Sequence, residues 1–87
     1  MMETLTLNPD VAFKRLDDRM VLVHVATNQI YELNATGARV WELLHEGIAG
    51  DALVDRLATE FEADPTEVRE EIESLLGELV KAGLMSP

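Results

Sequence analysis

A chain of 87 residues without cysteine is long enough for one small domain, and it excludes disulfide frameworks and cysteine-based metal sites. The 17 acidic residues outnumber the 7 basic ones, so the net charge of −10 disfavours nucleic acid and anionic membranes as partners. No apolar run approaches the ~20 residues of a membrane span and the N-terminus lacks a signal-peptide pattern, so we expect one cytoplasmic domain over residues 1–87, ordered from about Asn8.

The first third of the chain predicts three short strands that form an antiparallel meander. Two polar breaks, Asp17-Asp18 and residues 26–28, separate runs that alternate with the period of two that strands require. The middle run is β-branched and apolar on nearly both faces, which is typical of a central strand. The expected strands are residues 11–16, 20–25 and 29–33.

The rest of the chain predicts three helices. The third has the clearest start, because Asp64 is a good N-cap, Pro65 suits the first helical position, and Glu67 completes a pattern similar to a capping box. Strands followed by helices indicate one α+β domain. The expected helices are residues 36–46, a short one after Gly50, and one from Pro65 that ends before Gly83. Their apolar stripes are expected to bury Trp41, Leu44, Leu57, Phe61, Ile72 and Leu79.

The sequence offers no catalytic constellation. The two histidines, His24 and His45, belong to no recognisable motif, and the glutamates lack metal-ligand spacing and read as solvated helix faces. An acyl carrier would need a serine at the start of a helix, whereas Ser74 lies in the middle of one. We therefore expect no catalytic residue, no metal and no cofactor.

What remains is a surface that can bind another chain. The third strand, residues 29–34, contains neither proline nor lysine, the residues that commonly protect an exposed strand edge. This absence favours an edge that pairs with a peptide. Dimerisation through the same edge stays an open alternative.

Several segments together resemble the PqqD-like family: Val21-Leu22-Val23, the run from Asn28 to Ala38, Val40-Trp41-Glu42-Leu43-Leu44, and Leu79-Val80-Lys81-Ala82-Gly83-Leu84. The resemblance covers nearly the whole chain from about Asn8. It implies a winged-helix-like element that captures the leader of a ribosomally made precursor peptide. Such an element presents the leader to a modifying enzyme and catalyses nothing itself.

The resemblance also implies where the leader lies: as a strand added beside the third strand, in the groove between that strand and the third helix. The helical wheel places Arg69 and Glu73 on one flank of Ile72 and Glu71 and Leu75 on the other. The wheel does not decide which flank faces the peptide, and we take the first. The expected peptide-binding residues are Asn28, Gln29, Ile30, Tyr31, Glu32, Leu33 and Asn34, with Val68, Arg69, Ile72, Glu73 and Leu76.

The segment before the third strand departs from relatives that serve pyrroloquinoline quinone assembly, because it lacks their basic, proline-containing stretch. This favours another pathway, such as lasso peptides or products of radical SAM enzymes. The expected partners are a precursor leader and a modifying enzyme such as a leader peptidase or a radical SAM enzyme. A DNA-binding winged helix is the main rival, but its recognition helix would have to be basic, and the third helix carries five glutamates between 67 and 78.

Overall fold

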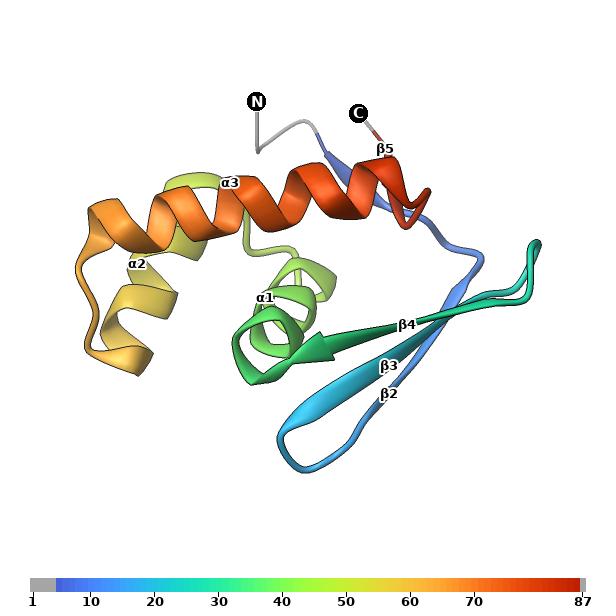
Figure 1. Cartoon of the computed structure of the whole chain (residues 1–87). Coiled ribbons are helices and arrows are strands. Elements are labelled where there is room, and N and C mark those ends of the chain that lie inside the picture. The colour runs from blue at the N-terminus through green and yellow to red at the C-terminus, as the bar shows by residue number, and fades with distance from the viewer. Residues whose placement is uncertain (1–4, 87) are drawn as a thin grey trace.

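The computed structural model describes residues 5–86 and shows a three-stranded antiparallel sheet followed by three helices (Figure 1). This order confirms the α+β prediction. The elements are β1 (Thr6–Leu7), β2 (Val11–Arg15), β3 (Arg19–His24), β4 (Gln29–Asn34), α1 (Ala35–His45), α2 (Gly50–Phe61), α3 (Pro65–Lys81) and β5 (Met85–Ser86).

Two of these strands, β1 and β5, were not expected. Thr6 pairs with Ser86 and Leu7 with Met85, so the two ends of the described chain form a separate two-stranded ladder. The ladder begins ahead of Asn8, the point at which order was expected to start. Two residues are too few to show the alternation by which a strand is recognised in a sequence.

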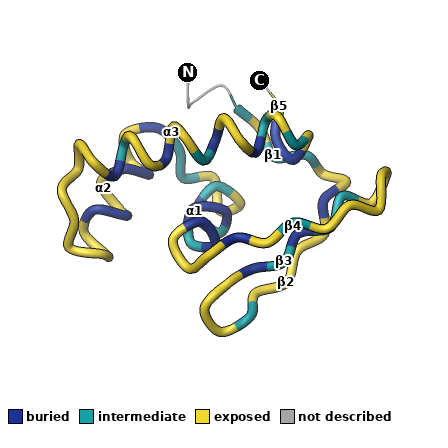
Figure 2. The backbone as a smooth tube through the Cα atoms, in the orientation of Figure 1, coloured by how far each residue is buried: buried dark blue, intermediate teal, exposed yellow. Residues whose placement is uncertain are grey.

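The main sheet has the order β2-β3-β4, so β3 is the central strand as predicted. Helix α1 covers one face of this sheet, and Met20 and Leu22 of β3 are completely buried beneath it. In Figure 2 the buried segments are found mainly along β3 and the helices, whereas β2 and the turns are mostly exposed. The core therefore sits between the sheet and the three helices.

Most of the predicted core residues are buried, but two are not. Trp41, Leu57, Ile72 and Leu79 are each at most 3% exposed. Leu44 is only partly buried, and Phe61 is 46% exposed. Phe61 is the last residue of α2, where the chain turns away through a left-handed residue, Glu62, so its ring extends beyond the core.

The helix ends follow the predicted signals. The Asn34 side chain accepts a hydrogen bond from the Gly37 amide at 2.9 Å and caps α1, and Asp64 accepts one from the Thr66 amide at 3.2 Å and caps α3. After α3 the chain turns at Gly83, whose φ of +78° is a left-handed conformation that favours glycine. No helix within residues 5–86 is long and apolar enough to cross a membrane.

Candidate peptide-binding site

The outer edge of β4 carries unpaired backbone groups, and the register identifies them. The Val25 amide donates to Asp10 at 3.0 Å, and the Arg19 carbonyl accepts from Leu16 at 2.8 Å. In an antiparallel ladder the groups of alternate residues point to opposite sides, so odd-numbered residues of β3 face β2 and even-numbered ones face β4.

The even-numbered residues of β3 pair with the odd-numbered residues of β4: Met20 with Leu33, Leu22 with Tyr31, and His24 with Gln29. The N–H and C=O groups of Ile30 and Glu32 therefore point away from β3. Among the strands of residues 5–86, the strand order leaves β4 without a neighbour on that side. An incoming strand would pair with Ile30 and Glu32.

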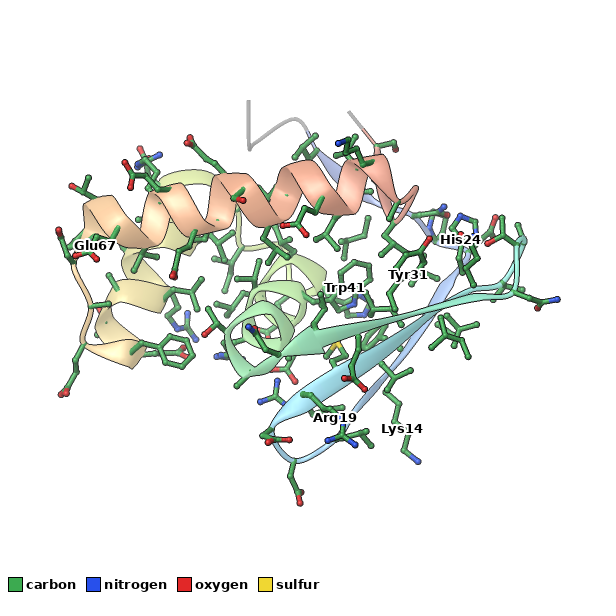
Figure 3. The ribbon with its side chains drawn as sticks, viewed as in Figure 1. Lys14, Arg19, His24, Tyr31, Trp41 and Glu67 are labelled. Carbon is green, nitrogen blue, oxygen red and sulfur yellow. The ribbon has the colours of Figure 1, made fainter. Side chains whose placement is uncertain are left out.

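The side chains of β4 divide between the two faces of the sheet. Leu33 is buried and Tyr31 is partly buried on the helix-covered face, whereas Ile30 is 71% exposed on the other. The Tyr31 hydroxyl donates to Gln29 Oε1 at 2.6 Å and lies 3.5 Å from the Ala82 carbonyl after α3. Figure 3 shows Tyr31 between β4 and the C-terminal part of α3. The strand is thus held close to the end of that helix.

Two adjoining hollows continue from the end of β4 toward α2, and we call them together the helical groove. The outer hollow lies next to β4, and the inner one, of about 150 Å³, lies between α1, α2 and α3. Thr36, Glu71 and Leu75 line both, so the groove is continuous. The outer hollow is also lined by Asn34 and Gly37, and the inner one by Val40, Leu57, Phe61, Ala63, Val68 and Ile72.

The structure places β4 against the flank of α3 opposite to the expected one. Glu71 and Leu75 face the end of β4, whereas Arg69 donates a hydrogen bond to Asp51 at the start of α2. Glu73 shares the flank of Arg69 by helical periodicity, and the Leu76 side chain is buried in the core. Of the expected α3 residues, only Val68 and Ile72 line the groove. Helix α2 packs against the flank that carries Arg69. A helical wheel of α3 alone does not show where α2 lies, so it could not identify the flank that faces β4.

The seven expected residues from Asn28 to Asn34 do lie together, on β4 and in the turn before it. Sequence reasoning missed Thr36 and Phe61, which line the inner hollow. Phe61 was predicted to be a core residue, but a ring at the end of a helix can also extend beyond the core. The wheel had identified Glu71 and Leu75, but on the flank that was set aside.

The two histidines have structural neighbours. His24 Nε2 lies 3.4 Å from Asn8 Nδ2, and the His45 ring stands edge-on to Phe13 with ring centres 5.0 Å apart. Within residues 5–86 no three His, Cys, Asp or Glu side chains gather as a metal site.

The sequence profile of the family described as coenzyme PQQ synthesis protein D (PqqD) matches residues 19–85. The chain belongs to the PqqD family. The matched residues of this PqqD-family chain include β4, α3 and the whole helical groove. None of the curated proteins compared with it matches.

Two solved structures are similar to this PqqD-family chain over nearly their whole length. TbiB1, in complex with the TbiA(beta) leader peptide, is 30% identical with a TM-score of 0.87, covering 92% of this chain and 93% of its own. A lasso peptide synthetase B1, complexed with the leader peptide, is 25% identical with a TM-score of 0.85, covering 95% and 98%.

Proposed function

We propose that this PqqD-family protein is a non-catalytic adaptor that binds the leader of a ribosomally made precursor peptide and delivers it to a modifying enzyme. The observation that carries the proposal is the unpaired edge of β4, which continues into the helical groove and its mainly apolar inner hollow. Main-chain pairing supplies affinity without regard to sequence, and a groove beside it reads side chains. Both similar structures hold leader peptides, which supports the same use here.

The leader pairs antiparallel to β4 in this proposal. Because β4 runs from Gln29 to Asn34, an antiparallel leader has its C-terminal end at Gln29 and its N-terminal end at Asn34. Residues of the leader that precede the pairing segment then reach the helical groove. Leader recognition thus has two parts: a strand that fixes the register and an upstream segment that fills the groove.

We further propose a cytoplasmic lasso-type pathway with a leader peptidase as the modifying enzyme, in preference to pyrroloquinoline quinone assembly. The stretch from His24 to Gln29 contains neither proline nor a basic residue other than histidine, and one of the similar structures is a lasso peptide synthetase B1. A radical SAM enzyme is the alternative partner. Co-elution with each candidate enzyme, with and without leader, separates the two.

The proposal is tested by a backbone amide NMR titration with the leader peptide of a candidate lasso-type precursor. Shifts are expected at residues 28–34 and around residues 36 and 71–75, because these line the edge and the groove. A footprint on the outer surface of α2, or no shift with excess leader, would contradict it. If sedimentation of the peptide-free protein gives twice the mass of one chain, a homodimer through β4 is favoured instead.

A further inference from the structure

The helical groove contains a single charged side chain. Of the residues that line its two hollows, only Glu71 is ionisable, and the rest are apolar or neutral. Glu71 is exposed and, within residues 5–86, takes part in no ion pair or side-chain hydrogen bond. Glu71 lines both the outer and the inner hollow.

Two arginines on the helices that form the groove are bound to other carboxylates. Arg39 of α1 is held by Glu60, and Arg69 of α3 is held by Asp51 on the opposite flank. Both arginines have a pKa raised by hydrogen bonds to their carboxylate partners. Within residues 5–86 no lysine or arginine forms an ion pair with Glu71, and the net charge of −10 adds a field of the same sign.

We infer that Glu71 makes the groove select a basic side chain, a lysine or arginine, on the leader segment that precedes the β4-pairing strand. This inference rests on the proposed function. The aliphatic stem of such a side chain packs on Leu75 while its cationic head pairs with the Glu71 carboxylate. The neighbouring inner hollow of about 150 Å³ then takes an apolar side chain close to the basic one. The recognised class is a short segment with a basic and an apolar residue together.

A selection from short random displayed peptides tests this inference, because it needs no leader of known sequence. Wild-type protein is compared with Glu71→Gln, Glu71→Lys and Glu70→Gln. Glu70 is the matched control, because it is an exposed glutamate next to Glu71 that lies on the side of α3 away from the core. Wild type and Glu70→Gln should enrich lysine or arginine at one position, Glu71→Gln should lose that preference, and Glu71→Lys should enrich aspartate or glutamate there.

A recovered peptide then measures the pair directly. Replacing its basic residue by glutamine should weaken binding to wild type about two- to fivefold, the range for a solvated ion pair, and leave binding to Glu71→Gln unchanged. Equal losses in both proteins, or the same peptides from wild type and Glu71→Gln, would overturn the inference.

A separate variant, Ile30→Pro, tests the proposed function, because it blocks pairing of a peptide with the β4 edge. If Ile30→Pro enriches the same peptides as wild type, strand addition is wrong, while the comparison of Glu71 variants still decides the charge preference. If peptides depend on Ile30 but show no charge preference, the function stands and the role of Glu71 is refuted. If no peptide is enriched over a non-binding control protein, both proposals fail.

Discussion

Arg39 on α1 and Glu60 on α2 form a two-point ion pair, with Nε 2.8 Å from Oε1 and Nη2 3.0 Å from Oε2. Arg56 adds a further contact to Glu60 at 3.1 Å. The hydrogen bonds from Arg39, the largest cause, lower the pKa of Glu60. This pair joins the two helices whose residues Val40 and Leu57 line the inner hollow. It therefore helps to keep that part of the groove in shape.

The ion pair predicts a pH-dependent loss of stability. Because the pKa of Glu60 is lower in the folded chain than the ~4.3 of an unfolded glutamate, its contribution is complete above that value and disappears as the pH falls through the folded pKa. The melting temperature of Glu60→Gln should thus lie below that of wild type at neutral pH, and the difference should shrink as the pH falls below ~4.3. Circular dichroism melts across this range measure it. A difference that does not change with pH contradicts the prediction, and Glu70→Gln is the control for loss of one charge.

Truncation of the two large aromatic side chains of the helices should have unequal costs. Trp41 is 1% exposed, so Trp41→Ala should lower the free energy of unfolding by ~3–5 kcal/mol. Phe61 is 46% exposed and Phe61→Ala should lower it by only ~1 kcal/mol, while peptide affinity falls because the inner hollow loses a wall. Urea unfolding measures both. Equal costs would contradict the packing described for α2.

Two glycines in and after α3 should respond to alanine with opposite signs. A Cβ at Gly77 meets no atom within 4 Å and the helical backbone suits alanine, so Gly77→Ala should stabilise the protein by ~0.5–1 kcal/mol. At Gly83 the backbone φ of +78° puts alanine under strain, and Gly83→Ala should destabilise by ~1–2 kcal/mol. Thermal unfolding of the two variants, compared with wild type, measures both effects. If Gly83→Ala is as stable as wild type, the left-handed turn after α3 is wrong.

Proline substitutions in β4 should separate binding from folding. Ile30→Pro removes an amide that points to the open edge, so peptide binding should be lost while the melting temperature changes little. Tyr31→Pro removes an amide that pairs with Leu22 and should destabilise the sheet itself. Calorimetric titration and thermal melts of both variants provide the comparison. The reverse pattern would mean that the register of β4 has been assigned one residue out of place.

The sequence predicted the strands and helices of the main domain because each shows its own period or cap. These signals are local: the alternation of residues 29–33, the β-branched run of β3 and the Asp64-Pro65 start of α3. Each of these segments forms the predicted element in the folded chain. The pairing of β1 with β5 has no local signal. It joins residues 80 positions apart, and only the assembled core brings them together.

The geometry of the candidate site was predictable in outline but not in detail. An unprotected edge is visible in the sequence, and β4 is indeed that edge. Which of Ile30 and Tyr31 points outward depends on the phase of the ladder, which is fixed by bonds such as that between Val25 and Asp10. Which flank of α3 faces β4 depends on the position of α2, which engages Arg69 through Asp51. Both are properties of the whole fold.

The pairing of Thr6 with Ser86 brings the two ends of the described chain to one place on the molecule. In Figure 1 these ends lie above α3, whereas β4 lies below it. A tether attached at either end would therefore leave the open edge of β4 clear. Fused by a flexible linker to an enzyme, the domain would raise the effective concentration of a bound peptide at that enzyme's active site, and the gain would depend on linker length rather than on which end carries the fusion.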